Sequence, residues 1–313
     1  MPIRLALIGA GSISSHHARV IAESTHARLD VVIDSDADKA QTLADQFGCS
    51  FSKLLDPAFK CDAAIVATST DSHTEIGLAL LEAGRPLLIE KPLASSVDDV
   101  DVLIKQSEAK DVPLMCGFVE RFNPVVGAAG AWIETSPLHL VALRHSPHTP
   151  RATASVVNDL LIHDIDLALR FFSGAKVARA YGMCSTPAGS LVEIADCSIE
   201  FENGAVATLS SSRTSHRKIR QIYIDTQDAL VEMDLLRTTL TVYRHVFHEQ
   251  VAATSTTYRA ETVVDIPFVR HAGEPLALQL DYFLKLCDGR ADADSERRGL
   301  FAPHRIAASI EGS

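Results

Sequence analysis

Basic charge is scarce in this sequence of 313 residues, where 29 Lys and Arg stand against 40 Asp and Glu and the formal net charge is −11. Such a chain lacks the broad basic field that attracts nucleic acids or anionic membranes, so we expect neither as a partner. A local basic pocket for a phosphate-bearing small molecule stays compatible with this charge balance.

Paired cysteines and long apolar runs are also missing. The six cysteines form no CxxC pair and have no metal-type spacing, which indicates reduced, mostly buried thiols. No segment approaches the roughly 18 consecutive apolar residues of a membrane helix. The apolar run in MPIRLALIGAG is too short for the core of a signal peptide. We therefore expect a soluble, cytoplasmic protein.

The first 120 residues alternate between apolar runs of strand length and helical segments. Because the runs are apolar on both faces, they predict a parallel sheet covered by helices on both sides. We expect strands over 3–9, 29–34, 61–68, 86–90 and 113–119, and helices over 14–24, 37–48, 71–84 and 96–110. A chain this long favours two domains. The first, residues 1–120, is then a Rossmann-type doubly wound domain of the α/β class.

Residues 121–313 have a different rhythm and predict an α+β domain. Antiparallel strands are expected between residues 178 and 244, with Asn203-Gly204 marking a hairpin turn. We expect a polar loop at 252–261 and two closing helices over 274–289 and 297–310.

The stretch LIGAGSIS, residues 7–14, places two glycines where the first strand meets the first helix. Gly9 permits a tight turn, and Gly11 lets a pyrophosphate approach the backbone at a helix N-terminus. Ser12 and Ile13 continue this cofactor-binding turn. Ser14 takes the place of the usual third glycine, which predicts slightly looser packing of helix on strand.

Asp34 closes the second strand, 20 residues after Ser14, where an acidic residue binds the ribose 2′-hydroxyl of a dinucleotide. Its charge would repel a 2′-phosphate and no arginine follows it, so the predicted cofactor is NAD rather than NADP. An ordinary glycine turn with a strand-end aspartate is the competing interpretation.

Two further stretches carry candidate chemistry. In LLIEKPLA, Lys91 ends a buried parallel strand, where open α/β sheets bind ligands, although a surface lysine fits equally well. In NDLLIHDIDLALRFF, residues 158–172, the polar residues form one stripe, which by periodicity alone favours a solvated helix face. A metal site is a weaker alternative, because HDID lacks zinc-helix spacing and hydride transfer needs no metal. We predict no metal.

Three motifs in order give the chain a family resemblance: VATSTDSHTEIGLALLEAGRPLLIEKPLA, GFVERFNP and DLLIHDID. They resemble the glucose–fructose oxidoreductase/inositol dehydrogenase (Gfo/Idh/MocA) family. The resemblance implies a two-domain NAD(P)-dependent dehydrogenase of sugars or cyclitols, with an open, largely antiparallel sheet in the second domain. Because a helix-free sheet face exposes apolar area, we expect a homodimer or homotetramer.

The resemblance also assigns site residues. It makes Lys91 the active-site lysine, followed by a possible cis bond to Pro92. Thr68, Ser69 and His73 fall in the loop along the cofactor, and Glu90 beside the nicotinamide ribose.

On the later helix, the resemblance pairs Asp159 with His163. The histidine exchanges a proton with the substrate hydroxyl, while the aspartate binds or orients it. Asp164 and Asp166 support the helix and the histidine ring. The hydroxyl then lies between Lys91 and His163, and either one can be the base.

The finer resemblance is to the branch that oxidises the 3-hydroxyl of UDP-N-acetylglucosamine, which would supply a sugar aminotransferase. Arg144 and Arg151, with two histidines, form a basic loop that could grip a diphosphate. Arg121 and Asn123 reach the substrate region by family analogy, or Arg121 braces the domain junction.

Two alternatives stay open. The enzyme could act on inositol, a free sugar or a dihydrodiol. A non-catalytic NAD-binding sensor could keep the glycine turn but would not need Lys91 and His163.

Overall fold

A computed structural model describes residues 1–148, 152–187, 189, 191–252 and 255–312. The chain forms two compact units. The first comprises Met1–Phe122 and Gly273–Ala308, and the second comprises Asn123–Ala272 and Ser309–Ser313. The expected division into 1–120 and 121–313 therefore differs at the C-terminal helices, most of which belong to the first unit.

The first unit is built on a six-stranded parallel sheet with the order β3-β2-β1-β4-β5-β6. This is the strand order of a dinucleotide-binding Rossmann fold, so the predicted fold class is confirmed. The strands are β1 (Ile3–Ile8), β2 (Ala27–Ile33), β3 (Ser50–Ser52), β4 (Ala63–Val66), β5 (Leu87–Ile89) and β6 (Leu114–Cys116). The connecting helices are α1 (Ser12–Glu23), α2 (Ala37–Phe47), α3 (His73–Glu82) and α4 (Val97–Lys110).

Local sequence signals set the ends of these helices. The Asp36 side chain accepts hydrogen bonds from the first amides of α2, and Gly48 ends that helix with a left-handed φ of 66°. The Ser96 side chain caps α4 in the same way. Caps satisfy backbone groups that a helix end leaves unpaired, which explains why these boundaries are visible in the sequence.

Three later helices return to the first unit: α7 (Pro275–Cys287), α8 (Ala293–Arg298) and α9 (Phe301–Glu311), the last of which ends in the second unit. On α7, Leu280, Phe283 and Leu284 are buried in the same apolar cluster as the strands β1 and β4. This burial is the physical reason that the chain re-enters the first unit after residue 272.

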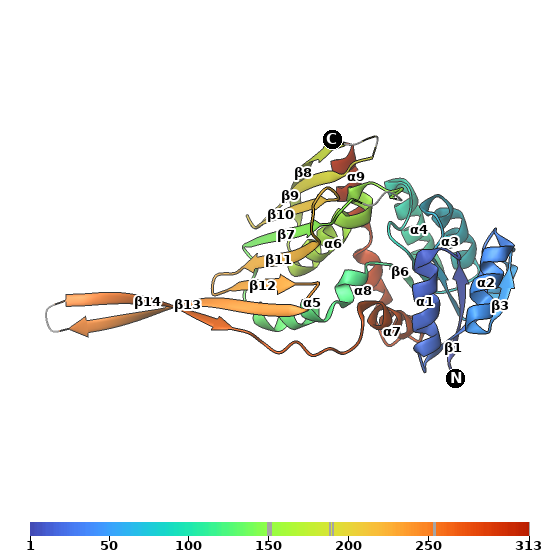
Figure 1. Ribbon diagram of the computed structural model, residues 1–313, viewed down its shortest axis with the longest axis horizontal. Helices are drawn as coiled ribbons and strands as arrows, with labels where there is room; N and C mark the ends of the chain where they lie inside the picture. The colour runs from blue at the N-terminus through green and yellow to red at the C-terminus, as the bar shows by residue number, and fades with distance from the viewer. Residues whose placement is uncertain (149–151, 188, 190, 253–254, 313) are drawn as a thin grey trace. The chain divides into compact units, whose positions relative to one another are not determined.

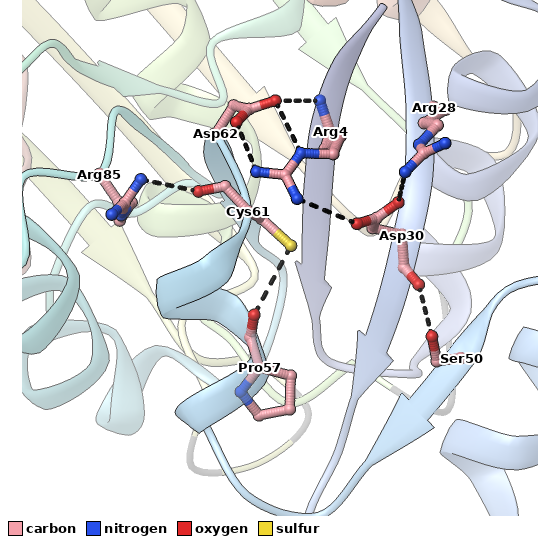
Figure 2. A network of polar contacts seen from close by, with 8 residues as sticks. All are labelled: Arg4, Arg28, Asp30, Ser50, Pro57, Cys61, Asp62 and Arg85. Atoms are coloured by element: carbon pink, nitrogen blue, oxygen red, sulfur yellow. Dashed lines mark hydrogen bonds and ion pairs between the residues drawn. The ribbon is translucent and has the colours of Figure 1, made fainter.

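A polar network ties the first unit's strands together at their amino ends (Figure 2). Arg4 donates to both carboxylate oxygens of Asp62, at 2.8 and 3.2 Å from its side chain, and Asp62 also accepts the Arg4 backbone N–H at 2.9 Å. Asp30 forms an ion pair with Arg28, in which Oδ1 lies 2.9 Å from Nη2. These contacts lie at the end of the strands opposite to their carboxyl termini, where open α/β sheets bind ligands.

The second unit holds an eight-stranded sheet with the order β14-β13-β12-β11-β7-β10-β9-β8 (Figure 1). All neighbouring pairs are antiparallel except β7 with β10. The strands are β7 (His139–His145), β8 (Val177–Ser185), β9 (Ile194–Phe201), β10 (Val206–Ser212), β11 (Ile219–Asp225), β12 (Leu230–Asp234), β13 (Thr239–Ala252) and β14 (Ser255–Asp265). The helices are α5 (Pro124–Ala129) and α6 (Ile162–Phe171). The expected largely antiparallel sheet is thereby confirmed.

Residues 252–261 were expected to form a polar loop, and that expectation is wrong. Most of this stretch is part of β14, which pairs with β13 along an extended hairpin that continues past β12 (Figure 1). The threonines and the tyrosine of this stretch are residue types that are common in strands, and pairing with β13 outweighs their polarity. Among the described residues, no helix combines the length and apolar character needed to cross a bilayer.

Candidate cofactor and active-site residues

A pocket of about 860 Å³ opens in the first unit at the carboxyl ends of β1, β2 and β4. The residues predicted to bind the cofactor that line it are Gly9, Gly11, Ser12, Ile13, Asp34, Thr68 and Ser69. Other residues that line the pocket were not predicted from the sequence, among them Lys39, Lys53, Ser72 and Ile76. Lys53 is far from the glycine motif in sequence, so only the parallel sheet order could have placed it here.

The glycine turn leaves room for a ligand. Gly9 has a φ of 104°, and a Cβ there would lie 2.4 Å from the Ala67 carbonyl oxygen, so the turn requires glycine. At Gly11 a Cβ would meet no heavy atom within 4 Å. Gly11 is also the N-cap of α1, and a helix N-terminus beside an open pocket favours a phosphate group.

Backbone hydrogen bonds orient the Asp34 carboxylate at this pocket. Its Oδ2 accepts the Ala10 N–H at 2.7 Å and its Oδ1 accepts the Asp36 N–H at 2.9 Å. Because a carboxylate offers about four lone-pair positions, it can still accept a hydrogen bond from a hydroxyl group. The pocket therefore fits a dinucleotide: open backbone for the pyrophosphate and a fixed acceptor for a ribose.

His73 is the exception among the residues predicted in the cofactor loop. It is buried behind the loop, with Nδ1 3.0 Å from the Pro92 carbonyl oxygen and Nε2 3.3 Å from that of Thr68. A neutral ring donates to one of these two carbonyls, and burial lowers the pKa of His73. The structure thus gives His73 a supporting role for the loop instead of a position lining the pocket.

The segment Glu90–Lys91–Pro92 follows β5, and its Lys91–Pro92 bond is cis, as expected. Glu90 and Lys91 do not line the described pocket. The Glu90 carboxylate accepts the Lys91 backbone N–H at 3.2 Å and lies 2.7 Å from Nε2 of His17 on α1. Nothing in the sequence pattern pointed to a role for His17 beside Glu90.

In the second unit, the polar helix begins with a π-helical turn, η5 (Val157–Leu161), which continues into α6. His163 is only 7% exposed, and Asp164 and Asp166 are 2% exposed. The solvated-face interpretation therefore fails for His163 and Asp166, whereas the side chains of Asp159 and Arg170 on the same stripe are 41% and 47% exposed. Single π turns occur often at functional sites, which agrees with the placement of Asp159 in this turn.

Asp159 is held by an arginine that the sequence pattern did not predict. Arg213, 2% exposed, donates from Nη2 to Asp159 Oδ2 at 3.0 Å. Its two Nη atoms also donate to the Ala154 carbonyl oxygen at 3.0 and 3.1 Å. A buried, permanently charged group thus fixes the start of the helix that carries His163.

Three residues expected at the substrate make buried contacts within the protein. Arg121 pairs with Glu296 at 2.5 Å, with both side chains buried. Asn123 caps α5 and donates to the Leu235 carbonyl oxygen at 3.1 Å. These buried contacts hold the fold, and the assignment of Arg121 and Asn123 to the substrate region stays a prediction.

The third of these residues, Arg144, lies on β7 and binds Asp164 through two hydrogen bonds of 2.7 and 2.9 Å. Both side chains are almost fully buried. Arg144 therefore supports α6 and does not belong to an open basic loop. Arg151 lies outside the described residues.

Lys91 belongs to the first unit, whereas Asp159 and His163 belong to the second. Within the described part of the chain, no three His, Cys, Asp or Glu side chains are grouped so as to hold a metal ion.

Comparison with protein families identifies both halves of the chain. The family model described as "Oxidoreductase family, NAD-binding Rossmann fold" (GFO_IDH_MocA) matches residues 3–118. The model of the GFO/IDH/MocA C-terminal domain matches residues 140–231.

Similar proteins cover nearly the whole chain. UDP-N-acetylglucosamine 3-dehydrogenase of Acidithiobacillus ferrooxidans is 28% identical over 99% of this chain and 97% of that protein. A solved structure of that enzyme, at 26% identity, superposes with a TM-score of 0.85 and covers 100% of this chain and 98% of its own. The scyllo-inositol 2-dehydrogenase (NAD(+)) of Bacillus subtilis is 25% identical over 95% of each chain.

Proposed function

Because this chain belongs to the GFO/IDH/MocA family of NAD-dependent oxidoreductases, we propose that it oxidises the 3-hydroxyl of UDP-N-acetylglucosamine to the 3-keto sugar. The observation that carries the substrate is the end-to-end similarity to an enzyme of that name. Arg144 adds no support for a diphosphate site, since it is committed to Asp164.

The cofactor is NAD, which supplies a hydride acceptor when bound. Gly9 and Gly11 would leave room for its pyrophosphate at the start of α1, and Asp34 would accept a ribose hydroxyl. Thr68 and Ser69 would border the same pocket. These residues bind and orient, and the remaining chemistry is the removal of one proton.

That proton leaves the substrate hydroxyl as the carbon loses its hydride and the C–O bond becomes a carbonyl. Lys91 or His163 accepts it, and Asp159 orients the substrate or the imidazole. The buried position of His163 and the arginine clamp on Asp159 support these roles. Turnover that survives in both Lys91→Met and His163→Ala would contradict this assignment.

The substrate test mixes purified protein with NAD⁺ and UDP-N-acetylglucosamine and follows NADH absorbance. Since a 3-keto product can be thermodynamically uphill, a sugar aminotransferase with glutamate is included to draw the reaction forward. We expect NADH with this sugar and inhibition by UDP. Turnover with inositol or glucose but none with the nucleotide sugar would favour the inositol-type alternative. NAD⁺ binding without turnover of any of these would favour a sensor.

The proposal extends to assembly and location. We propose a cytoplasmic homodimer or homotetramer that supplies a 3-keto sugar to an aminotransferase. Tyr181 and Met183, at 60% and 74% exposure, present apolar surface on the edge strand β8, which supports association. Light scattering that finds only a monomer would refute the oligomer.

A further inference from the structure

The segment that carries Lys91 is surrounded by buried histidines from three helices of the first unit. His17 of α1 contacts Glu90, His73 of α3 contacts Pro92, and His304 of α9 accepts the Leu93 N–H at 2.9 Å. His73 and His304 bind backbone groups. His17 binds a charged side chain, so it can change the electrostatics beside Lys91.

The contact between His17 and Glu90 is short and shielded from water. Nε2 of His17 lies 2.7 Å from Glu90 Oε1, and the two side chains are 2% and 13% exposed. An ionised carboxylate can only accept hydrogen bonds, so beside an ionised Glu90 the donor of this contact is Nε2 of His17. The second oxygen, Oε2, accepts the Lys91 backbone N–H at 3.2 Å.

The neighbouring strand end is shaped around this carboxylate. A Cβ at Gly117, just after β6, would lie 2.6 Å from Glu90 Oε2 and 3.0 Å from Glu90 Cα. Glycine at this position therefore leaves the space that the carboxylate occupies. His17, the Lys91 amide and Gly117 together confine the carboxylate to one position.

We propose that His17 is a positioning residue that keeps the Glu90 carboxylate ionised and aimed beside Lys91. Burial alone raises the pKa of Glu90, but the His17 hydrogen bond, with the charges of His17 and Lys91, outweighs burial and holds that pKa below its ordinary value. The charged or titratable groups that act on the carboxylate are His17, Lys91 and His73. The effect on catalysis rests on the proposed function of Lys91, whereas the state of Glu90 does not.

Ionised Glu90 has two consequences for the proposed reaction. Its negative charge stabilises positive charge at the Lys91 end of β5, and its fixed position constrains the Lys91 backbone. Without His17 the same buried carboxyl group would favour its neutral form. A neutral Glu90 would donate or release hydrogen bonds and would no longer hold the segment in one conformation.

The direct test titrates Glu90 in the cofactor-free protein. Protein labelled with ¹³C at glutamate carboxyls is followed by NMR against pH, and the Glu90 signal is assigned with Glu90→Gln. We expect His17→Leu to move the titration of Glu90 upward and His17→Gln, which restores an N–H donor, to move it less. The matched control is His16→Leu, the same change at the adjacent exposed histidine. An unchanged Glu90 titration in His17→Leu would overturn the proposal.

A second variant covers the case in which His17→Leu does not fold. Gly117→Ala leaves His17 intact but places a methyl group where the carboxylate lies, and we expect it too to disturb the Glu90 titration. A wild-type titration in both Gly117→Ala and His17→Gln would contradict the confinement of the Glu90 carboxylate.

The catalytic consequence is read from kcat/KM against pH. We expect His17→Leu to shift the acid limb of the profile to higher pH, because Glu90 then loses its charge at a higher pH. At low pH, kcat/KM should fall by roughly 10–100-fold, which is less than the loss of a typical direct acid–base group causes. His16→Leu should keep the wild-type profile. If the wild-type protein turns over no sugar, the proposed function fails while the titration still tests the role of His17. A normal profile in a variant whose Glu90 titration has moved would refute the link to Lys91.

Discussion

Arg213 offers a quantitative test of how the helix that carries His163 is fixed. Replacing it with methionine keeps an unbranched apolar stem but removes three hydrogen bonds, two to the Ala154 carbonyl oxygen and one to Asp159. Hydrogen bonds to charged groups contribute about 1.5–3 kcal/mol each. Ala154 is exposed and the Asp159 side chain is 41% exposed, so water can replace the lost donor at both. We therefore expect a loss of only about 2 kcal/mol in the free energy of unfolding.

The assay is urea unfolding of four proteins: wild type, Arg213→Met, Asp159→Asn and the double variant. Because the two side chains touch, their coupling energy should be about 1 kcal/mol. Arg237→Met is the matched control, since Arg237 also pairs with an aspartate, Asp234, but its side chain is 74% exposed. We expect it to cost about 0.5 kcal/mol or less. Equal losses in the free energy of unfolding for Arg213→Met and Arg237→Met, with no coupling energy between Arg213 and Asp159, would contradict the structural role of Arg213.

Three further results are expected. Asp34→Ser should raise kcat/KM for NADP⁺ relative to kcat/KM for NAD⁺. The substitution removes the charge that repels a 2′-phosphate, and lysines also line this pocket. An unchanged ratio would contradict this role of Asp34. Arg144→Met should cost about 3–5 kcal/mol in urea unfolding, because it leaves the Asp164 carboxylate buried without its bidentate partner; a loss below 1 kcal/mol would indicate that Asp164 is neutral or rehydrated. The side-chain hydrogen bond from Arg4 lowers the pKa of Asp62 in the folded protein. The ionised Asp62 therefore stabilises the fold above the ordinary carboxyl pKa of about 3.9, and this stabilisation is lost as the pH falls through the pKa of Asp62 in the folded protein. In Arg4→Met, the free energy of unfolding should fall less steeply with decreasing pH.

The Rossmann half could be predicted because its signals are local. Apolar runs of strand length, caps such as Asp36 and the Gly9 turn each act within a few residues of the chain. The spacing after the glycine turn then placed Asp34 at the cofactor pocket, and the order of three motifs identified the family. The position of the cofactor pocket follows from the predicted parallel sheet, since parallel strands bring their carboxyl ends to one edge.

The contacts that the sequence did not reveal join residues far apart in the chain. His17 meets Glu90 across 73 residues, and Arg213 meets Asp159 across 54. Arg144 is different, because it shares strand parity with the buried residues Leu140 and Ala142 on β7. An arginine on the buried face of a strand predicts a buried carboxylate partner, so this signal was available.

The central claim is tested most directly by the fate of one hydrogen atom. UDP-N-acetylglucosamine carrying deuterium at carbon 3 is incubated with the protein, NAD⁺ and the aminotransferase system, and the reduced cofactor is analysed by mass spectrometry. A dehydrogenase of the 3-hydroxyl transfers that deuterium, so we expect singly deuterated NADH in proportion to the sugar consumed. Unlabelled NADH, or labelled sugar recovered unchanged while inositol is oxidised, would contradict the proposed function.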